Sequence, residues 1–206
     1  MDITFLIAAF ATLFVVIDPI GLAPMFVALT KGAPFSHRRN VALRACIISI
    51  FLLTLFGLLG ETILNFVGIS MPAFRIAGGI LLFLTALDML FERRTARRKG
   101  QAQTHADPSV FPLATPLIAG PGSMATMILL TGQAETPVGI FWVMMVMVAV
   151  VIVAFMLFLT ANWLERVLGD TGINVVTRLL GMLLAALSVQ FVLDGLASFG
   201  LGTMPG

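Results

Sequence analysis

The chain has 206 residues, of which 59% are hydrophobic and 11% are charged, and its formal net charge is +2. A soluble domain carries about 25% charged residues, so this composition excludes an ordinary globular protein. The small net charge gives no signal for nucleic-acid binding. Apolar runs long enough to cross the hydrocarbon core of a bilayer recur six times along the chain. We therefore predict an all-α membrane protein with six transmembrane helices.

The predicted spans are joined by short polar connections. The residues between Lys31 and Arg39 are expected to form a loop, and residues 92–109 a longer cytoplasmic loop. Ser70 as N-cap, with Pro72 in the first turn, predicts the start of the third span. The spans are expected at residues 3–30, 41–60, 71–91, 110–131, 137–163 and 174–198.

The two tryptophans, Trp142 and Trp163, are 21 residues apart within the fifth predicted span. On one helix this spacing is about 32 Å. We therefore expect one tryptophan at each membrane interface. No basic stretch precedes the first apolar run, so a signal peptide is not expected.

Basic residues are distributed unequally between the two predicted sides. The connections after spans 1, 3 and 5, with the adjoining span ends, hold eleven of the 12 Lys and Arg residues, and the other side holds only Arg75. The positive-inside rule then places both termini outside a bacterial inner membrane. The eleven are Lys31, Arg38, Arg39, Arg44, Arg93, Arg94, Arg97, Arg98, Lys99, Arg166 and Arg178.

Two spans contain a break. Residues Asp18–Pro24 interrupt span 1, and residues Ala119–Ser123 interrupt span 4. The prolines remove backbone donors, and a charge such as that of Asp18 costs about 2.5–3.5 kcal/mol at the centre of a membrane helix. Such breaks persist in a membrane only where they are buried in protein or line a cavity.

The two breaks belong to an internal repeat. A shift of 102 residues places Pro19 on Pro121, and a shift of 103 places Arg75 on Arg178. The chain is therefore predicted to consist of two three-helix repeats, residues 1–91 and 110–206, joined by the loop of residues 92–109. Three spans are an odd number, so the repeats are inverted (3+3). Inverted repeats with a discontinuous helix in each half are typical of transporters.

A substrate site is predicted at the breaks. The first amides of each second half-helix can bind an anionic group, while Asp18 and freed carbonyl groups can bind an ammonium group. Glycines allow close approach of a small solute. The alternative is that proline and glycine only kink the helices. The candidate substrate-binding residues are Asp18, Pro19, Gly21, Ala23, Pro24, Gly120, Pro121, Gly122, Ser123, Thr126 and Gln190.

Three charged residues are candidates for gating or coupling. Asp18 can bind the ammonium group, carry a coupling proton or pair structurally with a neighbour. Arg75 and Arg178 occupy equivalent places in the two halves. Each can extend to the membrane interface, or can form a gating pair with Asp194 or Asp88.

Four motifs resemble the MarC family of membrane proteins: Asp18–Gly21, Gly68–Gly79, Pro116–Gly122, and Thr177–Gly181 with Val189–Phe191. The resemblance implies a transporter of small neutral amino acids, glycine and alanine among them, related to LysE-type exporters. Many MarC proteins have Asn where this chain has Asp18.

We therefore expect a transporter that works by alternating access. No nucleotide-binding loop is present, so its energy would come from a proton or sodium gradient, or from the gradient of the solute itself. The alternative is an exporter of cations or other small metabolites on the same scaffold. An enzyme is not expected, because Asp18 has no second carboxylate at its level in the sequence. One cysteine and two histidines predict no metal site, and no cofactor is expected. Formation of a homo-oligomer is left open.

Overall fold

The computed structural model describes residues 3–91, 107–134 and 136–199, and within them the chain forms helices and no strand. Five helices are long and apolar enough to cross a membrane, and the bent pair η1–α6 makes a sixth candidate span. The predicted all-α membrane fold is confirmed at this level. The helices are α1 (Ile3–Ile17), α2 (Pro19–Leu29), α3 (Phe35–Val67), α4 (Met71–Leu90), η1 (Ser109–Ile118), α6 (Pro121–Gln133), α7 (Pro137–Leu159) and α8 (Ala161–Ala197).

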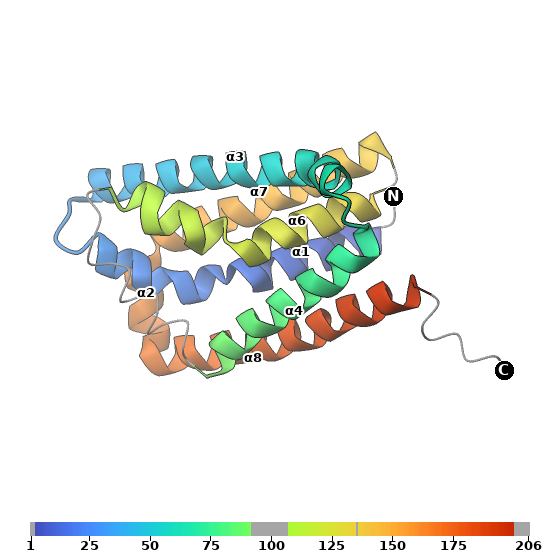
Figure 1. The fold of residues 1–206 in the computed structure, drawn as a ribbon. Helices are drawn as coiled ribbons and strands as arrows, with labels where there is room; N and C mark the ends of the chain where they lie inside the picture. Colours follow the sequence, from blue (N-terminus) through green and yellow to red (C-terminus); the bar gives the residue numbers. More distant parts are fainter. Residues whose placement is uncertain (1–2, 92–106, 135, 200–206) are drawn as a thin grey trace.

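The helices form three layers (Figure 1). α3 and α7 lie along one side of the bundle, and α4 and α8 pack against each other along the opposite side. The interrupted helices lie between them: η1 and α6 contact α3, while α1 and α2 contact α7. The inner layer reaches the α4–α8 pair through α6 and α2. Most residues of the two breaks are therefore covered by protein, a setting in which irregular backbone is tolerated in a membrane.

Glycines allow α4 and α8 to approach closely. A Cβ atom on Gly79 of α4 would lie 2.8 Å from the carbonyl oxygen of Ser188 on α8. A Cβ atom on Gly181 of α8 would lie 2.9 Å from Cβ of Met89 on α4. In lipid there is little hydrophobic force between helices, so close packing of this kind is a main source of their association.

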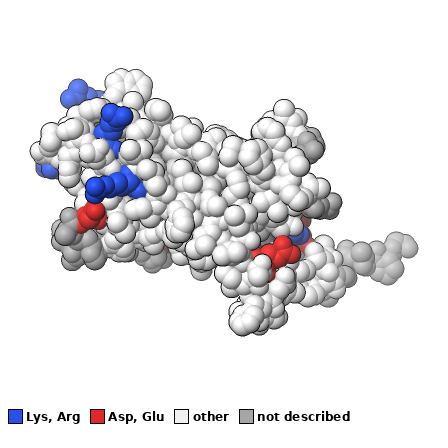
Figure 2. Space-filling view, turned by 90° about the horizontal axis from the view of Figure 1, so that it is seen from above, with Lys and Arg blue, Asp and Glu red and all other residues white. Residues whose placement is uncertain are grey.

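The first described residues of α1 and the last residues of α8 lie at the same end of the bundle (Figure 1). The α2–α3 and α7–α8 connections lie at the opposite end. Figure 2 shows Lys and Arg side chains gathered at that opposite end, on the left in both views. The Lys and Arg residues, which are distributed unequally along the sequence, are therefore also distributed unequally between the two ends of the bundle.

Two predicted helix starts are confirmed. α4 begins at Met71, where the backbone N–H of Ala73 donates to Oγ of Ser70 at 3.4 Å. α7 begins at Pro137, where the N–H of Gly139 donates to Oγ1 of Thr136 at 3.1 Å. Both caps satisfy a donor that the helix itself leaves without a partner.

The loop predicted between Lys31 and Arg39 is wrong in its second part. α3 begins at Phe35, directly after Pro34, whose extended backbone (φ −65°, ψ 156°) forms the N-cap. The polar residues of this first turn therefore belong to the helix, although they lie outside the apolar run. Hydropathy indicates where lipid surrounds a helix, and the helix itself can extend further. Of the predicted loop 92–109, residues 92–106 lie outside the described part of the chain.

The prediction that Trp142 and Trp163 lie on one helix is also wrong. α7 ends at Leu159, and Trp163 belongs to α8. α8 is bent at Gly169, whose φ of +62° favours glycine, and its membrane-spanning part begins at Thr171. The residues before this bend run across the end of the bundle (Figure 1).

The segment before the second break is more irregular than the sequence suggested. η1 is wound more widely than an α-helix, and the backbone at Phe111 and Thr115 is extended. Each of these residues precedes a proline, Pro112 or Pro116, and this position disfavours the α conformation.

Candidate functional site

Asp18 forms the first break. It is fully buried (0% exposed) and adopts a left-handed backbone conformation, with φ 55° and ψ 60°. Its N–H donates to the carbonyl oxygen of Phe14 at 2.9 Å, and its own carbonyl accepts from the N–H of Leu22 at 3.0 Å. α1 and α2 are thus joined through a single non-helical residue.

The carboxylate of Asp18 caps the start of α2. Its Oδ1 accepts a hydrogen bond from the N–H of Gly21 at 3.1 Å. A Cβ atom on Gly21 would overlap this carboxylate, so the glycine is required by the cap. The sequence had suggested that Gly21 leaves room for a ligand; in this structure the space is occupied by Asp18.

The second break is a bend of 53° between η1 and α6. Ser123 holds the turn: its Oγ accepts from the N–H of Gly120 at 2.9 Å and donates to the carbonyl oxygen of Ile118 at 2.7 Å. A Cβ atom on Gly120 would overlap the carbonyl oxygen of Pro116, so a glycine is needed here too. Ser123 therefore braces the backbone in this structure.

The two breaks use the same helix positions in different ways. Asp18 and Gly120 are N-caps, and Pro19 and Pro121 follow them as the first helical residues. In the first break the N-cap side chain accepts from the third helical residue, whereas in the second the side chain of the third residue accepts from the N-cap. The first break therefore carries a carboxylate, and the N-cap of the second has no side chain.

The breaks lie close together in space. A Cβ atom on Gly122, at the start of α6, would lie 3.3 Å from Cγ1 of Val16, two residues before Asp18. It would also lie 3.4 Å from Cδ2 of Leu82 and 3.7 Å from Oγ1 of Thr85, both on α4. The start of α6, the end of α1 and the middle of α4 thus meet at one buried point. Val16 and Leu82 gave no signal in the sequence, because apolar residues in apolar spans look alike.

The other candidate substrate-binding residues are placed differently. Ala23 and Thr126 are buried, and Oγ1 of Thr126 donates to the carbonyl oxygen of Gly122 at 2.8 Å. Pro24 is half-buried and Pro121 is exposed. Gln190 is exposed, and its Nε2 donates to Oδ1 of Asp194 on the same helix at 2.7 Å. Gln190 is therefore not brought to the breaks.

The candidate gating residues lie on the α4–α8 pair. Arg75 is half-buried, and its Nε is buried without a hydrogen-bond partner. Arg178 is exposed. A Cβ atom on Gly195 of α8 would lie 3.0 Å from the carbonyl oxygen of Pro72 on α4, so Arg75 and Asp194 flank the same contact between the helices. No ion pair within 4.0 Å joins them in the described residues.

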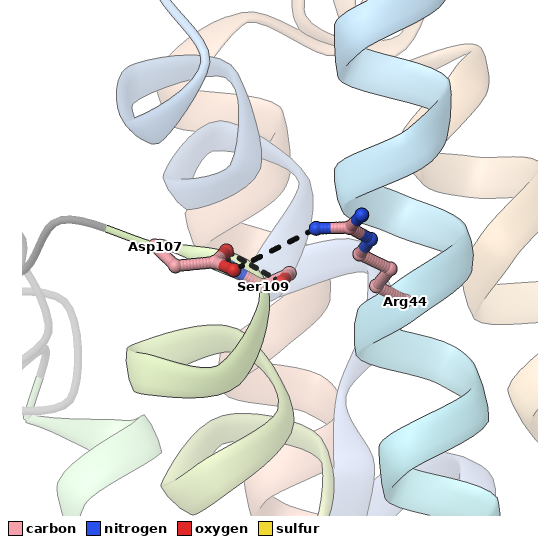
Figure 3. Close-up of polar contacts among 3 residues, drawn as sticks. All are labelled: Arg44, Asp107 and Ser109. Carbon is pink, nitrogen blue, oxygen red and sulfur yellow. Dashed lines mark hydrogen bonds and ion pairs between the residues drawn. The ribbon is translucent and has the colours of Figure 1, made fainter.

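A polar contact that the sequence did not suggest joins α3 to the start of η1 (Figure 3). Nη1 of Arg44 lies 3.9 Å from Oδ2 of Asp107. Oδ1 of Asp107 accepts from the hydroxyl of Ser109 at 2.6 Å and from its N–H at 3.0 Å. These hydrogen bonds, with a smaller contribution from Arg44, lower the pKa of the Asp107 carboxyl below its ordinary value.

Five long apolar helices and the bent pair η1–α6 are typical of a polytopic α-helical membrane protein. A family model described as "MarC family integral membrane protein" matches residues 3–199, and the chain belongs to this family. A UPF0056 membrane protein of Aquifex aeolicus is 37% identical over 196 residues, covering 92% of this chain and 91% of the relative. One of Methanocaldococcus jannaschii is 36% identical, covering 95% and 98%. UPF0056 membrane protein YhcE of Escherichia coli is 34% identical, covering 96% and 92%. No solved structure matches the chain.

Proposed function

We propose that this chain transports small neutral amino acids, glycine and alanine among them, by alternating access. The observation that carries the proposal is the meeting of two chemically different breaks. One holds the buried carboxylate of Asp18, and the other is the start of α6, where Gly122 lies against Val16. An amino acid has an ammonium group for the carboxylate, and a carboxylate for the first amides and positive dipole end of α6.

An inverted repeat is part of this proposal. Exchange of α1, α2, α3 and α4 with η1, α6, α7 and α8 maps the main helix contacts onto one another. α3 contacts η1 and α6 as α7 contacts α1 and α2, and α4 contacts α6 as α8 contacts α2. The matched N-cap and first-turn positions in the two breaks also support repeats at residues 1–91 and 110–206, with residues 92–109 as their connection.

Gating by Arg75 and Arg178 follows from the same symmetry. Gly195, whose added Cβ would lie 3.0 Å from the carbonyl oxygen of Pro72, brings the turn of Asp194 near that of Arg75 at one end of the α4–α8 contact. Gly181, whose added Cβ would lie against Met89, brings the turn of Arg178 near that of Asp88 at the other end. Each end of the pair then carries an arginine from one half and an aspartate from the other. We propose that these pairs close alternately on the two sides of the membrane.

The proposed orientation places the basic end in the cytoplasm and both termini outside the inner membrane. Lys31 and Ser198 are exposed at opposite ends of the bundle. Cysteines at these two positions, in a Cys46→Ala background, should react with an impermeant maleimide from opposite sides, with Ser198→Cys labelled in intact cells. Labelling of both positions from one side would contradict the orientation.

Radiolabelled flux tests the transport proposal. The purified chain in proteoliposomes should take up glycine and alanine in a saturable way, with proton and sodium gradients imposed separately to identify the coupling ion. Empty liposomes and an Asp18→Ala variant serve as controls. Absence of saturable flux of either amino acid under every gradient would reject the proposal.

A second candidate is export of cations or other small metabolites. The buried carboxylate of Asp18 favours it, because a carboxylate would also bind a cation that has no carboxylate of its own. The two candidates differ in competition. Excess glycine should inhibit transport by an amino-acid carrier, whereas a cation exporter should be inhibited by amines or metal ions and not by glycine.

A further inference from the structure

We infer that residues 161–168 form an interfacial helix that lies on the headgroup layer of anionic phospholipids. This segment, here called the interfacial segment, is the part of α8 that precedes the bend at Gly169. It runs across the end of the bundle where the basic side chains gather (Figures 1 and 2). The inference does not depend on the proposed transport activity.

The interfacial segment has one face on the protein and one face away from it. Ala161 and Leu164 are buried in the core. Trp163 and Val167, one helical turn apart, are 64% and 60% exposed. A helix of this kind, with one face on the protein and an exposed tryptophan at the end of a membrane bundle, is typical of the lipid interface.

Charge identifies the lipid as anionic. Arg166 is exposed beside Trp163, and Glu165 is half-buried. These two charges balance formally, so the positive charge at this end comes from the neighbouring basic residues. Nη2 of Arg38 donates to Oδ1 of Asn162 at 3.3 Å and attaches the basic start of α3 to the segment. Lys31 and Arg39 are exposed near the same end. Each basic residue near an anionic surface contributes about 1 kcal/mol.

The interfacial segment also joins two layers of the bundle. It is the connection between α7, in the α3–α7 layer, and the spanning part of α8, in the α4–α8 pair. A segment held at the lipid surface would fix the height of this connection in the membrane, while the bend at Gly169 allows the two layers to differ in direction.

The chain offers its own probe, because it contains two tryptophans and no tyrosine. Trp142→Phe leaves Trp163 as the sole indole, and Trp163→Phe leaves Trp142, near the start of α7 at the other end of the bundle. Both full-length variants are reconstituted into phosphatidylcholine vesicles. A fixed fraction of brominated lipid is added, either phosphatidylcholine brominated near the headgroup or near the chain end, or phosphatidylglycerol brominated near the headgroup.

For Trp163 we expect stronger quenching by the shallow bromine than by the deep one, and stronger quenching by the anionic than by the neutral brominated lipid. Trp142 should show no preference for the anionic lipid. Arg166→Gln should reduce the anionic preference at Trp163 by up to roughly fivefold, and Arg166→Lys should retain it. Stronger quenching by the deep bromine, or quenching of Trp163 only by aqueous acrylamide, would overturn the interfacial placement. Equal quenching by neutral and anionic lipid would overturn the choice of partner.

Discussion

Asp18 holds a backbone conformation that few residues adopt. The left-handed region costs a residue with a Cβ atom roughly 1–2 kcal/mol, and Asp and Asn tolerate it because their short polar side chains bond the nearby backbone. Here that bond is the one from the N–H of Gly21 to Oδ1. An Asn at this position can keep both the conformation and the cap.

Asp18→Asn should therefore retain the fold and the exchange of small neutral amino acids, because its Oδ1 can still accept a hydrogen bond from the ammonium group of the substrate. It should lose most of the pH dependence of net uptake, because an amide cannot carry a proton. Asp18→Ala should lose the cap, about 1 kcal/mol, as well as the tolerance of the left-handed backbone. Melting temperature in detergent and flux at several external pH values measure the two effects. An Asp18→Asn protein with the parental pH profile would show that Asp18 is not the coupling site.

The effect of Gly21→Ala on stability should change sign when Asp18 is replaced by Ala. In the parent chain the new Cβ overlaps the Asp18 carboxylate, so we expect a loss of about 1–3 kcal/mol of stability. In an Asp18→Ala background the overlap is gone, and Ala is favoured over Gly in a helix by about 1 kcal/mol. A double-mutant cycle on the free energy of unfolding measures the coupling. Additive effects would mean that the two residues do not meet as described.

The ends of helices show how far the sequence could predict the fold. Ser70 as N-cap and Pro137 as first helical residue predict the starts of their helices, and both starts are correct. The start of α3 at Phe35 and the bend of α8 at Gly169 were not predicted, because the predicted ends of the spans followed the apolar runs. The local reasons, Pro34 as N-cap and a single glycine with positive φ, are ordinary features that hydropathy does not report. Residues 18–24 and 119–123 could be recognised in the sequence as Pro-Gly clusters, but the contact of Gly122 with Val16 required the fold.

The contact between Asp107 and Ser109 fixes the start of η1 and should respond to acid. Because the folded pKa of Asp107 is lowered, its contribution to stability is present above the unfolded pKa and is lost as pH falls through the folded pKa. The difference in melting temperature between the parent and Asp107→Ala should thus shrink towards zero below about pH 4. Asp107→Asn, which still accepts from Ser109, should lose less at neutral pH. A difference that stays constant into acid would contradict this role.

The buried side chains of the molecule form two clusters, and the candidate site lies at the boundary between them. The α3–α7 layer and most of the interrupted helices share one large buried cluster, while α4 and α8 share a smaller one with the end of α1 and a residue of α6. The point where Gly122 meets Leu82 and Thr85 lies between these two bodies. Alternating access would open this boundary, whereas the glycine contacts within the α4–α8 pair would stay closed.

Two glycine substitutions test this division. Gly79→Ala places a Cβ 2.8 Å from the backbone oxygen of Ser188, which cannot move without separating α4 from α8, so we expect a clear loss of stability. Gly122→Ala meets the ends of the Val16 and Leu82 side chains at 3.3 and 3.4 Å, which can adjust. It should leave the melting temperature nearly unchanged but lower flux, and lower it more for alanine than for glycine because the added methyl group takes space beside the substrate. Melting temperature and flux are measured on the same preparations.

A Gly122→Ala protein with parental flux of both amino acids would remove the start of α6 from the transport path. A Gly79→Ala protein of full stability would mean that α4 and α8 do not pack as closely as described.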